Sequence, residues 1–500
     1  MSSAELTFTG AVRSASPRPF GYILSVLILA AVTSSFESTM MYTALPSLEA
    51  GFGVDISAAS WVLTGFLLVG AASAAIAGRL GDVFGRKRVL VILLIASVAG
   101  SVISLVVPTI GGVILGRAVQ GLAGGILPLA FGIIREHVSA KNLSIAIAVT
   151  AGAAMLAGAG GNLIAGYIVQ FSSWQWIFVV SGVLTVVTTI LAAWLPDSVR
   201  TGIRDRIDWL GGILFAPAIA LILFGINVST GLGWASPVVW GMIGIGALVL
   251  VFWAIWEAKQ QAPMVNVRYF AQRNLGLTYL ITALTGFGLG GAGYLGQLIM
   301  QYPTAAPVGF GIPAGAAGLT SFCIGFLGFL LAPVSGRVAR GGHAKTSFVI
   351  SAVTGIIAAV LTAMSATVWN SFPAFIVSQV ILTVSTSFLL SSLPLLVVEG
   401  AAARNTSEAT GISTVIQTAA SGIGTSVSAA ILAVFAIEVS EVAPGFEAST
   451  EQGYVVIFAL TAVLTALALV AAIFLKRRPA GERDADAESA DDLELPVLTH

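Results

Sequence analysis

Fourteen apolar runs divide this chain, each close to the ~20 residues that a helix needs to cross a bilayer. Of all residues, 57% are hydrophobic and 9% are charged, whereas soluble domains carry roughly 25% charged residues. The pattern therefore predicts an all-α polytopic protein of the cell membrane with about fourteen transmembrane helices. The runs fall near 20–43, 57–78, 88–107, 109–134, 143–168, 174–195, 208–227, 236–256, 274–300, 313–333, 346–366, 370–396, 409–437 and 454–475.

The distribution of positive charge predicts the orientation, because short loops rich in Lys and Arg stay on the cytoplasmic side. Counted from a cytoplasmic start, 22 of the 23 Lys and Arg fall in cytoplasmic loops or tails, and only Arg117 falls inside a span. Loops assigned to the outside carry acids such as Glu49, Asp55 and Glu438. Both termini are expected in the cytoplasm, since 1–19 also lacks the apolar core of a cleavable signal peptide.

The spans group as six, two and six. The second span of the last group ends at Gly336-Arg337, and the second span of the first group ends at Gly78-Arg79. A similarity of this kind is typical of parallel six-helix repeats. Seven carboxylates between Glu482 and Glu494 predict a disordered end. The predicted divisions are a cytoplasmic N-terminal tail (1–19), an N-terminal six-helix bundle (20–195), a linker with two additional transmembrane helices (196–273), a C-terminal six-helix bundle (274–475) and an acidic, disordered cytoplasmic tail (476–500).

Several classes of protein do not fit this composition. The formal net charge is zero and there is no basic tract with interleaved aromatics, so no nucleic acid is expected as a partner. Cys323 is the single cysteine and the three histidines are far apart, so we expect no metal site and no cofactor. An enzyme would show His, Asp or Cys clustered at helix ends, and a channel more often comes from a short, oligomerising chain. A transporter that works as a monomer fits better.

A charged turn, Gly-Arg-Leu-Gly-Asp-Val-Phe-Gly-Arg-Lys-Arg at 78–88, joins the second and third spans. Gly81 and Gly85 permit close backbone approach and φ > 0, so Asp82 could bind arginines or a facing helix N-terminus and latch one conformation. For the individual arginines, a solvated charge cluster is the simpler interpretation. The residues predicted to form the latch are Gly78, Asp82, Gly85, Arg86 and Arg88.

Glu37 and Arg117 are the ionisable acid and base that fall well inside predicted spans. An intramembrane charge is expensive and is by default a candidate functional residue. Glu37 precedes Thr43 by ~9 Å of helix and Arg117 follows Thr109 by ~12 Å, so both are expected in the outer half of the membrane. The protonation of a buried carboxyl depends on a nearby cation, which favours proton coupling; a static structural ion pair is the alternative.

Glycines and uncharged polar residues mark two further spans. Gly158, Gly161 and Gly166 crowd the span near 143–168, where close helix packing is the simplest account. The glycine-rich span 274–300 ends near Tyr294 and Gln297, groups that suit the binding of a largely apolar solute; packing with interfacial tyrosines is the alternative. The candidate cavity residues are Gln120, Tyr294, Gln297, Gln301 and Gln417.

The charged turn at 78–88 is similar to the loop signature of the major facilitator superfamily, and Arg117-Ala118-Val119-Gln120-Gly121 looks like its fourth-helix motif. With the six-two-six count, residues 20–475 resemble the fourteen-helix drug:proton antiporter branch. The resemblance implies alternating access between two six-helix bundles, a conformational role for Asp82 and a bending or sealing role for 161–166. Two positions depart from that branch, because Glu37 replaces its usual Asp and Asn162 replaces the proline of its antiporter motif.

The sequence therefore predicts a secondary active transporter, not an enzyme, that exports amphipathic or hydrophobic small molecules such as drug-like compounds, lipids or metabolites. The expected partners are this small-molecule substrate, protons taken in exchange, and membrane lipids. A facilitator or symporter for a sugar-like or other metabolite, without proton antiport, is the alternative. Collapse of export in vesicles on adding a protonophore would distinguish the two.

Overall fold

The computed structural model describes residues 19–138, 140–198, 209–233, 235–260, 267–339, 343–400, 406–442 and 446–475. The predicted acidic tail (476–500), nearly all of the N-terminal tail (1–19) and the basic linker 199–208 lie outside these residues. So does the side chain of Asp82. The described chain is almost entirely helical, which confirms the predicted all-α membrane fold.

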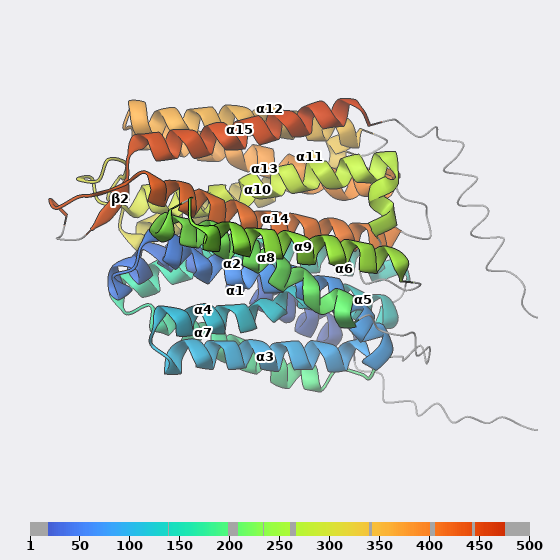
Figure 1. Cartoon of the computed structure of the whole chain (residues 1–500). Helices are drawn as coiled ribbons and strands as arrows, with labels where there is room; N and C mark the ends of the chain where they lie inside the picture. Colours follow the sequence, from blue (N-terminus) through green and yellow to red (C-terminus); the bar gives the residue numbers. More distant parts are fainter. Residues whose placement is uncertain are drawn as a thin grey trace, which may run out of the picture.

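The helices are long rods that lie side by side, and the N-terminal ones form the lower half of the view in Figure 1. A short 3-10 turn, η1, interrupts the fourth span. Gly121 and Gly124 of this turn lie so close to α2 that a Cβ on Gly124 would fall 2.6 Å from the carbonyl oxygen of Gly70. The N-terminal elements are α1 (Phe20–Phe52), α2 (Ile56–Phe84), α3 (Arg86–Val106), α4 (Ile110–Gln120), η1 (Gly121–Gly125), α5 (Ile126–His137), α6 (Ala140–Phe171) and α7 (Gln175–Ala193).

The C-terminal helices form the upper half of the same view, with α12 and α15 at its edge (Figure 1). One feature here was not predicted: a two-stranded antiparallel hairpin between the last two helices, in which Ala436 pairs with Ser449. The remaining elements are α8 (Trp209–Leu232), α9 (Pro237–Lys259), η2 (Val267–Ala271), α10 (Arg273–Gln301), α11 (Ala314–Ala339), α12 (Ala344–Ala363), the π-helical turn η3 (Met364–Val368), α13 (Phe372–Gly400), α14 (Thr406–Val434), β1 (Ala436–Glu438), β2 (Glu447–Ser449) and α15 (Glu451–Ile473).

The two groups of helices, α1–α7 and α10–α15, meet along two main seams, α6 against α11 and α2 against α14. The extra helices α8 and α9 pair with each other beside the second seam. Ile219 and Leu223 of α8 pack there against Leu68 of α2 and Ala419 of α14. The additional pair therefore contacts both groups at the edge of the α2–α14 seam.

The loops give the molecule two chemically different ends. One end holds the turn between α2 and α3, and we call it the basic end; the opposite end holds the hairpin and the turn between α1 and α2, and we call it the acidic end. By the positive-inside rule the basic end is the predicted cytoplasmic one. Described charged residues at the basic end include Arg86, Lys87, Arg88, Arg273 and Lys345, and those at the acidic end include Glu49, Asp55, Glu438, Glu441 and Glu447.

Thirteen helices among the described residues are long and apolar enough to cross a membrane. The fourteenth predicted span corresponds to α8, of which the shorter stretch Pro217–Ile226 meets the apolar criterion. The predicted end of the first span at Thr43 is wrong. The helix continues through Leu45 and Leu48, which bury against the core, and it ends where Gly53 adopts a left-handed φ of 60°. Glu37 therefore lies near the middle of α1.

Candidate functional site

Glu37 lies fully buried inside the N-terminal helix group. Its Oε1 accepts hydrogen bonds from three hydroxyls: Ser97 Oγ of α3 at 2.6 Å, Ser181 Oγ of α7 at 3.0 Å and Thr185 Oγ1 of α7 at 2.9 Å. A carboxylate accepts several hydrogen bonds at once. Three hydroxyls from two helices, α3 and α7, thus converge on one oxygen of the buried acid of α1.

Arg117 is also fully buried, on α4. Its guanidinium carbon lies 4.1 Å from the ring centre of Phe66, in cation–π range. Its Nη1 donates to Gln120 Oε1 at 3.0 Å, and Gln120 Nε2 donates in turn to Ser101 Oγ at 2.7 Å. The structure therefore uses Gln120, a predicted cavity residue, to support Arg117 inside the helix group.

The acid and the base are connected through α3. Ser101 Oγ donates to the carbonyl oxygen of Ser97, whose own hydroxyl binds Glu37, so a chain of hydrogen-bonded groups runs from Arg117 to Glu37. Within the described chain no direct hydrogen bond or ion pair joins the two side chains. Glu37 Oε2 and Arg117 Nη2 are buried without a hydrogen-bond partner among the described residues. Unsatisfied buried polar atoms are costly, so each of the two favours a partner. Glu37 Oε2 can take a proton or accept a hydrogen bond, and Arg117 Nη2 can donate one to a water molecule or a moving group.

The hydroxyl residues that surround Glu37 were not predicted from the sequence. Ser97, Ser101 and Ser104 follow one another at helical spacing on α3, and Ser181, Thr185 and Thr188 do the same on α7; all six are buried. Residues three or four apart share a helix face. Two such hydroxyl faces, in spans that neighbour an acid in the middle of the first span, were the signal that the sequence offered.

Helix α6 is packed between α1 and α11 through its small residues. Thr39 Oγ1 of α1 donates to the carbonyl oxygen of Gly158 at 2.7 Å, and Thr43 Oγ1 donates to Asn162 Oδ1 at 3.0 Å. A Cβ on Gly161 would clash with Thr39 Oγ1. Asn162 thus holds α6 against α1 at the position where the antiporter branch has proline.

On its other face, α6 contacts the C-terminal helix group. A Cβ on Gly166 would clash with the carbonyl oxygen of Ala314, at the start of α11. Close by, Gln170 Oε1 accepts a hydrogen bond from the backbone N–H of Gly315 at 2.9 Å. Gly166 therefore permits backbone contact between the two groups near the acidic end.

Three of the predicted cavity residues lie where α10 approaches α1, also near the acidic end. Gln301 Nε2 donates to the carbonyl oxygen of Thr43 at 2.9 Å and to Gln297 Oε1 at 3.2 Å. Tyr294 is buried in the apolar core shared by both helix groups. The structure places these residues in the contact between the groups, whereas Gln417 lies elsewhere, in a cavity between α13 and α14.

The same region contains a contact that the sequence did not predict. The hydroxyl of Tyr302, at the end of α10, lies 2.8 Å and 2.7 Å from the two carboxylate oxygens of Glu49 on α1. Burial, with Glu49 beside it, raises the pKa of the Tyr302 phenol well above its usual value, so this hydroxyl stays protonated and donates. We call the Glu49–Tyr302 pair the acidic-end contact.

In the turn between α2 and α3, Gly85 adopts φ 94°, a conformation that favours glycine. Arg86 then reaches α5, where its Nη1 donates to the carbonyl oxygen of Gly132 and lies 2.9 Å from Glu136 Oε1. Arg88 is exposed, and a Cβ on Gly78 would meet no atom within 4 Å. The turn is thus clamped to its own helix group through Arg86, while the predicted role of Asp82 lies outside the described side chains.

We expect Arg86→Gln to destabilise the N-terminal helix group by about 1.5–3 kcal/mol, the range for hydrogen bonds to charged groups. The reason is that Glu136 and the carbonyl of Gly132 lose their cationic donor. Thermal unfolding of the purified protein in detergent measures this. Arg88→Gln, an exposed position in the same turn, is the control and should leave the midpoint unchanged; equal losses in both variants would contradict the clamp.

No group of three or more His, Cys, Asp or Glu side chains suited to a metal ion occurs in the part of the chain that the structure describes.

The chain resembles known transport proteins. A family model described as Major Facilitator Superfamily matches residues 27–425. The multidrug resistance protein B homolog of Mycobacterium tuberculosis is 30% identical over 334 residues, 64% of this chain and 59% of the relative, so the chain spans about three fifths of that relative's length. A uridine/deoxyuridine transporter of Lactococcus lactis is 26% identical over 363 residues, 69% of this chain and 74% of the relative. The solved nucleoside transporter NupG shares the fold, with a TM-score of 0.64 at 13% identity over 90% of this chain and 99% of NupG.

Proposed function

The chain belongs to the major facilitator superfamily, and on that basis we propose that it exports amphipathic or hydrophobic small molecules in exchange for protons. The observation that carries this proposal is the buried acid of α1. Glu37 sits among hydroxyls from α3 and α7 with one oxygen unpartnered within the described chain. A group that gains and loses a proton inside the membrane is what coupling requires, and the multidrug-resistance relative supports the export of drug-like solutes.

Alternating access is supported by where the two helix groups touch. Besides the hydrogen bonds of Thr43, Glu49 and Gln170 given above, Thr64 Oγ1 of α2 lies 2.8 Å from Ser426 Oγ of α14. All four contacts lie in the half of each helix nearer the acidic end. Toward the basic end, Thr414 of α14 is exposed. A polar side chain is unfavourable against lipid tails, so its exposure fits a water-accessible surface. We infer a path open toward the basic end in this conformation.

Solute binding is proposed along this path. Gln417, Thr410 and Thr414 line a cavity beside Pro394. Hydroxyl and amide groups over apolar walls suit an amphipathic solute. Gln297 and Gln301 would then close the far end of the path, and Gln120 would act through Arg117.

The proton steps follow from the Glu37 site. In our proposal, rocking of the helix groups changes the distance between Arg117 and Glu37, and this change alters which protonation state of Glu37 is favoured. Arg117 keeps its proton throughout. Asp82, Gly78, Gly85 and the basic residues around them are proposed to stabilise one of the two access states.

The test uses the full chain in inverted vesicles with an imposed proton gradient. A fluorescent amphipathic dye should accumulate when the gradient is present, and a protonophore should abolish the accumulation. Dye uptake that is insensitive to the protonophore would exclude proton antiport. A uridine-specific flux under the same conditions would favour the alternative, a metabolite transporter, which the Lactococcus relative supports.

We expect Tyr302→Phe to weaken the acidic-end contact and to shift the protein toward a conformation open at that end. A typical hydrogen bond contributes about 0.5–1.5 kcal/mol, so the population ratio should change by roughly twofold to tenfold. Spin labels at Ser172 and Glu441, both exposed near the acidic end in different helix groups, report the separation.

The control for this variant is Tyr279→Phe on the same helix. The Tyr279 hydroxyl donates to the carbonyl oxygen of Ala409 within the C-terminal helix group. Its loss should leave the spin-label distances unchanged. Identical distance distributions for Tyr302→Phe and the unmodified protein would contradict the closing role of the contact.

A further inference from the structure

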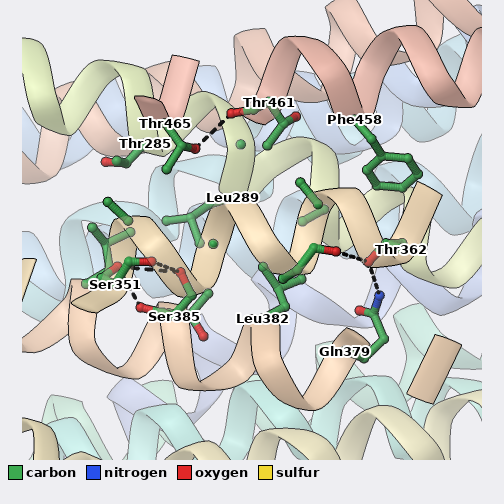
Figure 2. A pocket seen from close by; sticks show the side chains of 18 of the residues that line it. Thr285, Leu289, Ser351, Thr362, Gln379, Leu382, Ser385, Phe458, Thr461 and Thr465 are labelled. Carbon is green, nitrogen blue, oxygen red and sulfur yellow. Dashed lines mark hydrogen bonds between the residues drawn. The ribbon is translucent and has the colours of Figure 1, made fainter. Parts of the chain in front are cut away.

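A cavity lies inside the C-terminal helix group, between α10, α12, α13 and α15 (Figure 2). Side chains such as Leu289, Leu382 and Phe458 give it apolar walls, and hydroxyls from all four helices lie among them. Along α10 the lining runs from Thr285 to Gly296, ~16 Å of helix. None of the residues that line it carries a charge. The cavity is therefore long, apolar and neutral.

Six of the seven hydroxyls in the lining donate a hydrogen bond to a described neighbour. Thr285 Oγ1 donates to the carbonyl oxygen of Ile281 at 2.8 Å, and Thr465 Oγ1 donates to that of Thr461 at 2.8 Å. Ser351 binds across to α13, as Figure 2 shows. Hydroxyls that already donate to a protein oxygen do not need a water molecule as a partner. A cavity with mainly apolar walls can then bind an apolar molecule.

The amide of Gln379 also lies in the lining. Gln379 Nε2 lies 3.4 Å from Thr362 Oγ1, as drawn in Figure 2, whereas its Oε1 accepts no hydrogen bond from the described residues. This oxygen points toward α10, 3.6 Å from where a Cβ on Gly296 would lie. An amide acceptor without a described partner thus faces the cavity, and a carbonyl-type oxygen is a stronger acceptor than the hydroxyls, which already donate to other groups.

The cavity occupies the place in its helix group that the Glu37 cluster occupies in the other. Gln379 is the seventh residue after the first of α13, as Arg117 is in α4. Gly355 of α12 stands eleven residues after the helix start, as Ser97 does in α3. Helix α10 has no acidic residue. The C-terminal group therefore keeps hydroxyls in its interior. At the positions of Arg117 and Ser97, however, it has the uncharged Gln379 and the small Gly355, which leave space.

We propose that this cavity binds an uncharged, largely apolar small molecule that carries one hydrogen-bond donor, which Gln379 Oε1 accepts. The site goes beyond the export function proposed above, because it requires neither proton coupling nor movement between the helix groups. It lies within one group and is separate from the cavity at Gln417.

The first experiment fills the cavity. Ala292→Leu and Ala359→Leu together place larger side chains in the space, and Ala459→Leu, an exposed position on α15, is the matched control. The probe is 1-pyrenemethanol, and its affinity is obtained from the concentration dependence of the thermal midpoint of the full chain in detergent. We expect at least a roughly tenfold loss of affinity in the double variant and none in Ala459→Leu.

The second experiment tests the acceptor. Gln379→Met keeps the length of the side chain and removes the amide. It should weaken 1-pyrenemethanol by about fivefold, the effect of one neutral hydrogen bond, and leave the binding of 1-methylpyrene, which has no donor, unchanged. Each probe is compared between the variant and the unmodified protein in the same detergent, so its partition into micelles cancels and the difference reports the cavity.

Three results would overturn the proposal. The double variant could bind 1-pyrenemethanol as tightly as the unmodified protein, or Gln379→Met could weaken both probes equally. Native mass spectrometry could also show a phospholipid that the unmodified protein retains and the double variant lacks, in which case an acyl chain occupies the space. None of these results depends on proton-driven export, so failure of this site and failure of the proposed transport function are distinguishable.

Discussion

Glu37→Gln is expected to abolish uphill export while leaving the protein folded and able to bind solute. Glutamine keeps the length of the side chain, and its Oε1 can accept the same hydrogen bonds from Ser97, Ser181 and Thr185. It cannot titrate. Accumulation driven by a proton gradient in vesicles should fall to passive equilibration, and solute binding should lose its pH dependence.

Glu37→Asp is the matched control, because it keeps a titratable carboxyl on a shorter side chain. It should retain part of the accumulation, whereas Glu37→Gln should retain none. Retained proton-driven export by the Gln variant would exclude Glu37 as the proton carrier. In that case the hydroxyl cluster around it would be a structural feature of the helix group.

Gly166→Ala is expected to have the second large effect, on the equilibrium between access states. The added Cβ would meet the carbonyl oxygen of Ala314 on α11, and neither backbone can move aside cheaply. Overpacking costs about 1–3 kcal/mol, and it acts only where α6 and α11 touch near the acidic end. The conformation described here should therefore lose population by roughly tenfold, and the transport rate should fall with it.

Gly160→Ala gives the control on the same helix, since a Cβ there meets no atom within 4 Å. It should transport normally. Spin labels at Ser172 and Glu441 should report a wider acidic end for Gly166→Ala and an unchanged one for Gly160→Ala. If both variants transport at the unmodified rate, close approach at Gly166 is not needed for the cycle.

The sequence by itself determined the membrane class and the helical fold, and it singled out Glu37 as an acid within a span. These properties are local or compositional: a span is recognised by the length of its apolar run, and Glu37 by being an acid within one. The end of α1 was placed wrongly at Thr43 for the same local reason. The segment to Phe52 is less apolar, and its helix depends on burying Leu45 and Leu48 in the core.

Only the tertiary structure decided which side chains meet. Helices that are apolar on all sides give little sign of which face turns inward, and rotation about the helix axis is set by packing against neighbours. Glu49 and Tyr302 are 253 residues apart, and Ser181 is 144 residues from Glu37. Gln120 was predicted to line a cavity, whereas in the structure it accepts a hydrogen bond from Arg117 inside the helix group. A hydropathy pattern counts the helices, but the contacts between their faces, which build the sites, exist only once the helices are assembled.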